Sequence, residues 1–289
     1  MHVTFVGLGR MGAALASALV DAGIQVAGFD ISPEAQERAE RQGIRVLEDF
    51  ADVAHNSDVV LTSLPTVSAA RQVVFDLGAQ LPEGALVIET STCSPAFARD
   101  AAARLAERGV RFVDCPVSGK PPHTSMLVGG DEGIFGDAAP LVGQLATNVS
   151  YLGTIGAGYG VKLLQQYVKY ARFLVAAEAL SFAEHEGLDI PETVRALSSG
   201  TGARPGLATA EEYFLRDVDG IASHAPVATI AKDIELTRTM FLDAGFESPS
   251  FSALAEFFLT VDAGDHTGRP YPEAIDLLAD FRFTTESHR

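Results

Sequence analysis

The chain has 289 residues, 47% of them hydrophobic, and a formal net charge of −17. The length and apolar content support a large core and one or two domains. The acidic balance, without a block of Lys and Arg, argues against a nucleic-acid-binding surface, and the apolar runs are too short to cross a membrane. Because two cysteines form neither a disulfide framework nor a metal pattern and no signal peptide is evident, we expect a cytoplasmic protein.

The first half of the chain alternates short apolar strands with helical segments. Strands are expected over His2–Val6, Gln25–Phe29, Val59–Ser63, Leu86–Glu89, Arg111–Asp114, Met126–Val128 and Ser150–Leu152. Helices are expected over Met11–Ala22, Pro33–Gln42, Pro95–Arg108 and Glu132–Leu145. Strands separated by helices of this length predict a mostly parallel sheet with crossover helices.

The pattern changes after the glycine-rich junction Gly153–Gly158, beyond which only helical signals and loops occur. One long helix is expected from Gly158 to about His185. Further helices are expected over Ile190–Ser199, Ala208–Phe214, Pro226–Ala244 and Phe251–Ala263. We therefore predict an α/β domain over residues 1–157, followed by an all-α domain over residues 158–289, joined by the long helix.

The first strand runs directly into a GxGxxG motif, with Gly7, Gly9 and Gly12 ahead of a helix of small residues. In a dinucleotide-binding turn these glycines permit the tight turn, the close approach of a pyrophosphate, and close helix–strand packing. The phosphates then lie at the positive end of the helix. This context predicts a Rossmann-type doubly wound sheet that binds a dinucleotide along the turn Gly7, Leu8, Gly9, Arg10, Met11 and Gly12.

The second strand ends at Asp30, where an acidic side chain is expected to bind the adenine ribose hydroxyls. A carboxylate repels a 2′-phosphate, and Ile31 is not an arginine that would attract one, so the motif favours NAD over NADP. Alternatively, Asp30 helps to cap the helix that follows Ser32.

Five landmarks in the chain resemble, in order, those of the β-hydroxyacid dehydrogenase family. This family includes 3-hydroxyisobutyrate dehydrogenase, tartronate semialdehyde reductase and, more distantly, 6-phosphogluconate dehydrogenase. The landmarks are Gly7-Leu-Gly-Arg-Met-Gly12, Glu89-Thr-Ser-Thr92, Asp114-Cys-Pro-Val-Ser-Gly119, Gly156-Ala-Gly-Tyr-Gly-Val-Lys162 and Lys232-Asp233-Ile234. The resemblance covers nearly the whole chain.

The resemblance implies a two-domain NAD(P)-dependent oxidoreductase that moves a hydride between nicotinamide and a small 3-hydroxy acid or its semialdehyde or keto form. Lys162 would be the acid/base on the reacting oxygen. General acid–base catalysis of this kind is worth roughly 10²–10⁴-fold. Alternatively, Lys162 is a surface lysine at a helix start, but a cation there opposes the helix dipole. The resemblance also implies a homodimer or homotetramer and a small anionic substrate.

The family holds the substrate's acid group with the loop at Ser118 and Gly119, and two departures from its pattern occur near the expected site. Lys120 replaces a glycine in this loop, which also looks shorter, and Gln166 replaces the usual Asn one helical turn past Lys162. Lys120 either adds a cation for the substrate or is an exposed turn residue. The segment is not a P-loop, because it lacks GxxxxGK[ST]. The predicted substrate-binding residues are therefore Ser118, Gly119, Lys120 and Gln166.

Several other polar residues have two interpretations each. His123 is an exposed loop residue or a donor behind the substrate, and Lys169 is a solvated lysine or extends the polar stripe of Lys162. Ser91 and Thr92 cap the helix at Pro95 or reach the nicotinamide. Lys232 lies on the nicotinamide side or pairs with acidic neighbours. The predicted cofactor-binding set outside the glycine turn comprises Asp30, Leu64, Pro65, Thr66, Ser91, Thr92 and Lys232.

Two other functions compete with the dehydrogenase. Imine reductases share the expected architecture, but that group generally lacks the catalytic lysine. A non-catalytic NAD-binding sensor is the other alternative, which the change at Gln166 leaves open. The scattered histidines show no metal-ligand spacing, so no metal site is expected.

Overall fold

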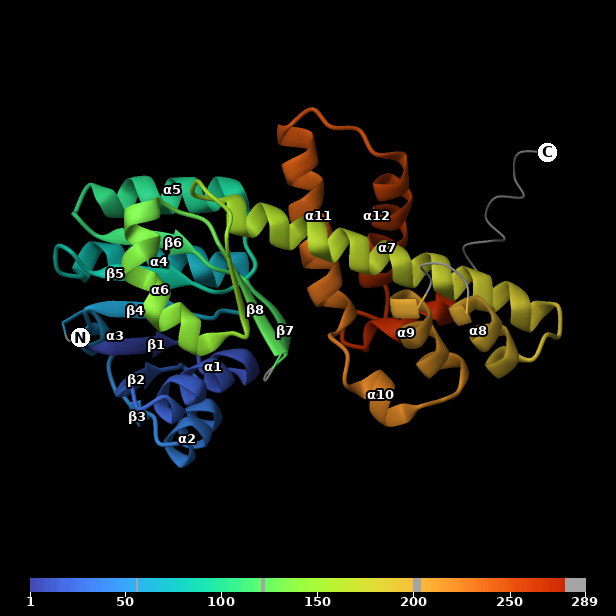
Figure 1. Cartoon of the computed structure of the whole chain (residues 1–289), viewed down its shortest axis with the longest axis horizontal. Helices are drawn as coiled ribbons and strands as arrows, with labels where there is room; N and C mark the ends of the chain where they lie inside the picture. Colours follow the sequence, from blue (N-terminus) through green and yellow to red (C-terminus); the bar gives the residue numbers. More distant parts are fainter. Residues whose placement is uncertain (56, 121–122, 200–203, 279–289) are drawn as a thin grey trace. The chain divides into compact units, whose positions relative to one another are not determined.

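The structure is a computed structural model that describes residues 1–55, 57–120, 123–199 and 204–278 (Figure 1). The chain divides into two compact units, Met1–Lys162 and Leu163–Arg289. The long helix α7 (Ala157–His185) contributes to both units. Each unit is described by itself below.

The first unit is built on a six-stranded parallel sheet with the order β3-β2-β1-β4-β5-β6. This is the strand order of a dinucleotide-binding Rossmann sheet, with the reversal of order between β1 and β4. The strands are β1 (Val3–Val6), β2 (Val26–Phe29), β3 (Arg45–Val46), β4 (Val59–Thr62), β5 (Leu86–Glu89) and β6 (Arg111–Asp114).

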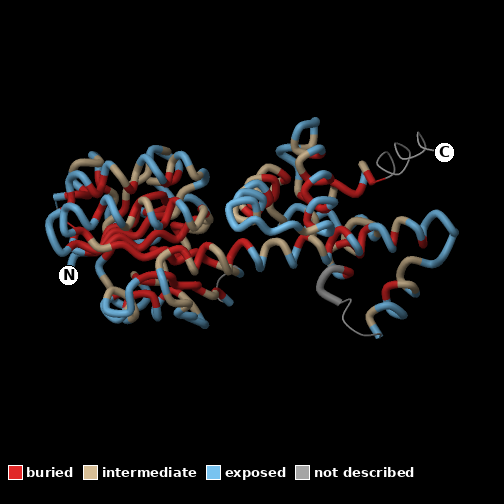
Figure 2. Tube along the Cα trace, turned by 90° about the horizontal axis from the view of Figure 1, so that it is seen from above, coloured by how far each residue is buried: buried red, intermediate tan, exposed pale blue. Residues whose placement is uncertain are grey.

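Helices cover both faces of this sheet, so its central strands are buried on both sides. The helices are α1 (Arg10–Asp21), α2 (Pro33–Arg41), α3 (Phe50–His55), α4 (Val67–Gln80), α5 (Pro95–Ala106) and α6 (Glu132–Leu145). Successive strand residues alternate between two cores: Phe5 packs with α1, α2 and α6, and its neighbour Val6 packs with α3, α4 and α5. Figure 2 shows the buried strands of this unit between helices with exposed outer faces.

A second, three-stranded sheet has the order β7-β8-β9, with β7 (Val117–Lys120), β8 (His123–Val128) and β9 (Asn148–Tyr151). The two strands predicted at Met126–Val128 and Ser150–Leu152 are confirmed as strands, but they lie here and not in the parallel sheet. The physical reason is the antiparallel β7–β8 hairpin, in which Lys120 pairs with His123. The prediction of a loop at Ser118–Lys120 is therefore wrong in its backbone, since these residues form β7.

The second unit contains helices and no strand among its described residues. Besides most of α7, it has α8 (Ile190–Ser199), α9 (Arg204–Phe214), α10 (Val218–Ala222), α11 (Val227–Asp243), α12 (Pro249–Asp262) and the 3₁₀ helix η1 (Tyr271–Leu277). Its core joins large apolar side chains of these helices, such as Phe173, Phe258 and Tyr271. The predicted fold class, a Rossmann-type sheet followed by an all-α region, is confirmed. Within the described residues, no helix is long and apolar enough to cross a membrane, and no group of three or more His, Cys, Asp and Glu side chains suits a metal ion.

Candidate active site

The predicted cofactor residues of the first unit follow the carboxyl ends of its parallel strands. The glycine turn follows β1, Asp30 follows β2, Leu64 follows β4 and Ser91 follows β5. Ligands of open α/β sheets bind outside the carboxyl ends of the strands, where the strand order reverses. The reversal between β1 and β4 therefore brings these residues to one edge of the sheet.

The glycine turn has the geometry that a dinucleotide requires. Gly7 has φ of +89°, a backbone conformation that side chains other than glycine rarely adopt. A methyl group on Gly12 would overlap the carbonyl oxygen of Gly7, so Gly12 lets α1 pack closely on the turn. A methyl group on Gly9, by contrast, would meet no protein atom within 4 Å. The open space at Gly9, beside the amino-terminal amides of α1, fits a pyrophosphate.

Asp30 ties the end of β2 to the glycine turn. One carboxylate oxygen accepts the N–H of Leu8 at 2.6 Å and the other accepts the N–H of Ser32 at 2.8 Å. The cap of α2 is the Ser32 hydroxyl, which accepts the N–H of Ala35, so Asp30 is not the capping residue itself. The carboxylate is half-buried beside the turn, and its ribose-binding role stays a prediction.

The ends of β4 and β5 are joined through Ser91, whose hydroxyl oxygen accepts the N–H of Leu64 at 2.7 Å. The alternative that Ser91 and Thr92 cap the next helix is wrong, because Ser94 caps α5 by accepting the N–H of Phe97. Thr66 caps α4, and both Thr66 and its neighbour Pro65 are exposed. Ser91 thus lies at the carboxyl edge of the sheet, and its contact with a nicotinamide stays a prediction.

The predicted substrate residues of the first unit lie on the hairpin. Ser118 is half-buried, and Gly119 is exposed with φ of +88°. His123 is exposed at the start of β8. The backbone of Lys120 belongs to β7, but its side chain lies outside what the structure describes, together with residues 121–122.

Lys162 lies near the start of α7, and only 7% of it is exposed. Two carboxylates of the parallel sheet hold this start. Asp114, the last residue of β6, accepts the N–H of Gly156 at 2.7 Å on one oxygen and that of Tyr159 at 2.8 Å on the other. Glu89, the last residue of β5, accepts the phenol O–H of Tyr159 and the N–H of Ser91.

These groups form a buried acidic cluster in which Glu89, Asp114 and Tyr159 are fully enclosed. Burial raises the pKa of Asp114 to about 6, against two helix amides that lower it. Burial also raises the pKa of Glu89, while its hydrogen bonds to Ser91 and Tyr159 oppose the shift. The pKa of Tyr159 lies well above its ordinary value through burial and the nearby Glu89 carboxylate, so the phenol stays protonated and donates. Burial likewise raises the pKa of the Cys115 thiol, which leaves that sulfur unreactive.

The second unit holds its own polar cluster around Asp233, which is 2% exposed. The side-chain N–H of Gln166 donates to Asp233 at 2.6 Å and to the Tyr170 hydroxyl at 2.9 Å. Lys232 pairs with Asp233 at 3.4 Å, which supports the acidic-neighbour interpretation of this lysine. Lys169 is exposed, with its ammonium nitrogen 5.2 Å from the centre of the Tyr170 ring. Gln166 lies one turn past Lys162 on α7, so both side chains share one face of that helix.

Comparison with known proteins agrees with this arrangement. Residues 2–153 match the family described as the NAD binding domain of 6-phosphogluconate dehydrogenase. Residues 156–278 match the family described as the NAD-binding of NADP-dependent 3-hydroxyisobutyrate dehydrogenase. A protein of Mycobacterium tuberculosis named probable 3-hydroxyisobutyrate dehydrogenase is 30% identical over 291 residues, covering 99% of this chain and 96% of its own.

The chain belongs to the β-hydroxyacid dehydrogenase family. It is therefore an oxidoreductase that acts on CH–OH groups with a nicotinamide cofactor. The solved structure of M. tuberculosis 3-hydroxyisobutyrate dehydrogenase with L-serine has a TM-score of 0.84 to this chain at 28% identity, covering 96% of this chain and 99% of its own. An imine reductase from Myxococcus stipitatus has a TM-score of 0.65 at 16% identity, covering 96% and 99% of the two chains, which shows a shared fold alone.

The most enclosed polar residues of this family member stand within or beside the sequence motifs. The motifs assign no role to Glu89, Asp114, Tyr159 and Asp233, because each has a partner 42 to 70 residues away along the chain. The sequence did contain a signal for two of these carboxylates. Glu89 and Asp114 each end an apolar strand that is expected to be buried, and a buried carboxylate needs hydrogen-bond donors.

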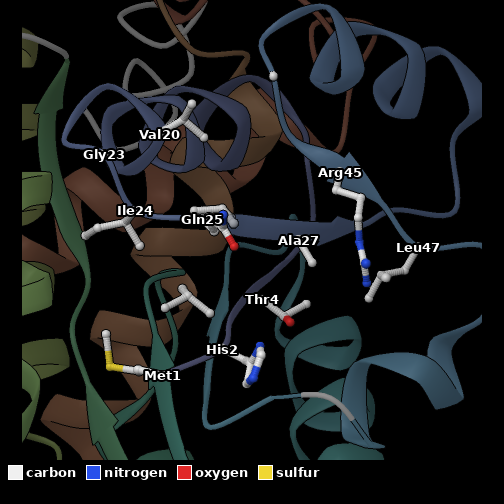
Figure 3. A pocket seen from close by; sticks show the side chains of 13 residues that line it. Met1, His2, Thr4, Val20, Gly23, Ile24, Gln25, Ala27, Arg45 and Leu47 are labelled. Carbon is white, nitrogen blue, oxygen red and sulfur yellow. The ribbon is translucent and has the colours of Figure 1, made fainter.

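A groove of about 870 Å³ lies elsewhere on the first unit, at the amino ends of its strands (Figure 3). Residues in or next to β1, β2 and β3 line it, among them His2, Thr4, Gln25 and Arg45. This edge is opposite to the carboxyl ends that carry the cofactor residues, so the groove is separate from the candidate active site.

Proposed function

We propose that this enzyme transfers a hydride between nicotinamide and a small 3-hydroxy acid, or its semialdehyde or keto form, with Lys162 as the acid/base. The observation that carries the proposal is the placement of Lys162. Lysine side chains are mostly exposed in folded proteins, whereas this one is buried. It is enclosed on the first turns of a helix whose start is fixed to the same sheet that carries the glycine turn.

The protein side of the reaction follows from this placement. When bound, the nicotinamide supplies or accepts the hydride at the carbon that bears the oxygen. During oxidation, the Lys162 amine takes the hydroxyl proton as the carbinol carbon loses its hydride. During reduction, the Lys162 ammonium returns a proton to the carbonyl oxygen as the carbon gains a hydride. Burial excludes water that would otherwise compete for the proton.

We propose NAD as the preferred cofactor. The Asp30 carboxylate stands beside the turn at Leu8, where it accepts ribose hydroxyls and repels a 2′-phosphate. Ile31, which is 90% exposed, adds no cation for such a phosphate. The proposed cofactor contacts otherwise are those predicted from the sequence, from the turn at Gly7–Gly12 to Lys232.

For the small anionic substrate, we propose Ser118, Gly119, Lys120 and Gln166 as the binding residues. The hairpin supports this role for Ser118 and Gly119 because Gly119 is exposed and has a left-handed backbone conformation that suits glycine alone. If Lys120 adds a cation, Lys120→Ala raises the KM of the acid substrate more than the KM of NAD. An equal effect on both, or none, would remove Lys120 from the substrate site.

We also propose that the protein is a cytoplasmic homodimer or homotetramer that pairs through the helical domain over residues 158–289, next to an NAD-binding domain over residues 1–157. One face of α7 exposes Leu164, Val168, Val175 and Phe182, at fractions of 43% to 66%. These positions repeat at four and seven residues along the helix, which makes a continuous apolar stripe. A second copy of this chain would bury such a stripe.

Lys162→Ala tests the central proposal, with Lys169→Ala on the same helix as the matched control. NADH absorbance is followed against a panel of hydroxy acids and semialdehydes, and NADH affinity is measured by titration. The expected result is turnover lowered by 10² or more in the first variant, with NADH affinity unchanged in both. Near-normal turnover of Lys162→Ala refutes the acid/base role. NAD binding by the unmodified protein without turnover of any compound of the panel favours the sensor.

A further inference from the structure

The amino-terminal amides of α7 are satisfied by a residue far away in sequence. Asp114 accepts the N–H groups of both Gly156 and Tyr159, although it precedes them by 42 and 45 residues. A carboxylate at a helix amino terminus also interacts favourably with the helix dipole. The last residue of β6 therefore acts as the cap of α7.

Glu89 makes a second connection to the same helix turn, through the side chain of Tyr159. Its carboxylate also accepts the Thr62 hydroxyl at 3.3 Å and the N–H of Ser91 at 3.1 Å. Thr62, Glu89 and Asp114 are neighbours in the register of β4, β5 and β6, so one row across the sheet edge holds the helix.

Glycines allow the helix to come this close. A methyl group on Gly158 would lie 2.8 Å from an Asp114 carboxylate oxygen and 2.9 Å from the Asp114 carbonyl oxygen. A methyl group on Gly129 would lie 2.6 Å from the other carboxylate oxygen. Gly158 and Gly129 thus leave room for the Asp114 carboxylate, and the start of α7 packs closely against it.

We propose that Glu89 and Asp114 are positioning residues that fix Lys162, through the first turn of α7, relative to the nicotinamide site. Lys162 follows Tyr159 by one turn, so a shift of that turn carries the lysine with it. A misplacement of about 1 Å costs up to about 10²-fold in rate. The inference rests on the proposed role of Lys162, but the anchoring of α7 itself is measurable without turnover.

The anchor is sensitive to pH. The titratable groups near Asp114 are Glu89 at the end of β5, Cys115 directly after β6 and Tyr159 of α7, and Lys162 follows Tyr159 by one helical turn. Near pH 6 Asp114 takes up a proton, and an O–H replaces one of its two acceptors for helix amides. Burial favours the protonated carboxyl group for stability, but the loss of one acceptor shifts the helix turn, and we therefore expect an acid limb in kcat near pH 6.

The experiment compares Asp114→Asn and Glu89→Gln with Asp131→Asn as the control. Asp131 also accepts two helix amides, those of Gly133 and Ile134, but it caps α6, which carries no proposed site residue. Three quantities are measured on the NADH-bound proteins: kcat on the best hydroxy acid of the panel, the pH profile of kcat, and deuterium uptake by residues 153–162. If Asp114→Asn or Glu89→Gln does not fold, Tyr159→Phe replaces it in the comparison, because it removes only the hydroxyl that donates to Glu89.

The expected result is a loss of kcat of tenfold or more in the Asp114 and Glu89 variants, with faster deuterium uptake by residues 153–162. The acid limb near pH 6 disappears in Asp114→Asn, whereas Asp131→Asn keeps kcat, profile and uptake. Unchanged uptake in both variants overturns the anchor. Faster uptake with kcat within threefold of the parent overturns the positioning role. Absence of turnover in the parent protein refutes the proposed function instead, and the uptake data still decide on the anchor.

Discussion

Two glycines of the cofactor turn offer a matched pair of substitutions with opposite expected effects. In Gly12→Ala the new methyl group overlaps the carbonyl oxygen of Gly7 and stands 3.0 Å from its carbonyl carbon and 3.2 Å from the Phe5 ring. Overpacking of this kind costs about 1–3 kcal/mol. At about 2–4 °C per kcal/mol for a unit of this size, Tm falls by about 2–12 °C. Since α1 must move away from the turn, NADH affinity falls as well.

In Gly9→Ala the methyl group meets no protein atom within 4 Å, and φ of −61° suits alanine. The lost flexibility of the unfolded chain stabilises by about 0.4–1 kcal/mol, which offsets a poorer helix cap. Tm therefore stays within about 3 °C, but the methyl group occupies the approach of the pyrophosphate. We expect the Kd of NADH to rise at least tenfold, or about 1.4 kcal/mol.

The assay pairs thermal unfolding without cofactor with titration of NADH by its own emission, which is free of tryptophan fluorescence because the chain has no Trp. The reasoning is refuted if Gly9→Ala binds NADH as tightly as the parent protein. It is equally refuted if Gly12→Ala melts at the parent temperature, because the close contact with Gly7 would then be absent.

Four further predictions concern single residues. Asp30→Ser lowers the ratio of kcat/KM with NAD to kcat/KM with NADP at least tenfold. An unchanged ratio would mean that Asp30 does not contact the adenine ribose. Gln166→Asn shortens the side chain by one methylene and loses the 2.6 Å bond to a buried carboxylate, at about 1–3 kcal/mol, which urea unfolding measures. Phe182→Glu places a charge in the apolar stripe of α7 and shifts sedimentation toward the monomer. For Asp114 the folded pKa of about 6 lies above its ordinary 3.8, so its contribution to stability is present below pH 4 and is lost by about pH 6. The unfolding free energy of the parent relative to Asp114→Asn should therefore fall between pH 4 and 6, and a rise would contradict the sign.

The sequence was informative where the structure depends on local pattern. The strand at Leu86–Glu89 and the helix at Glu132–Leu145 were predicted with their observed bounds, because an apolar run and a capped helical period each lie within a short segment. The two-residue strand β3 was missed, since Arg45–Val46 is too short to show an alternation. The hairpin at β7 was expected as a loop, because its register depends on pairing with β8 and not on its own residue types.

In the candidate site, too, the features set by local sequence were predictable and those set by distant partners were not. The glycine turn was predictable because its residues are consecutive and each has a separate steric reason. The anchor of α7 was not, since Asp114 and Tyr159 meet only after β5 and β6 have paired and the helix has packed on their ends. No local sequence pattern predicts that Asp114 and Tyr159 lie close together, or that Glu89 is buried.

The division of the chain just after Lys162 has a consequence for how such enzymes diversify. On the proposed assignment, the glycine turn that holds the cofactor and the lysine that moves the proton, Lys162, belong to one compact unit. The contact of Asp114 with the start of α7 connects them. Gln166 and Lys232 belong to the other. A chimera that joins residues 1–162 of this chain to the helical unit of a relative would keep the glycine turn, Lys162 and the hairpin residues, and would exchange Gln166 and Lys232.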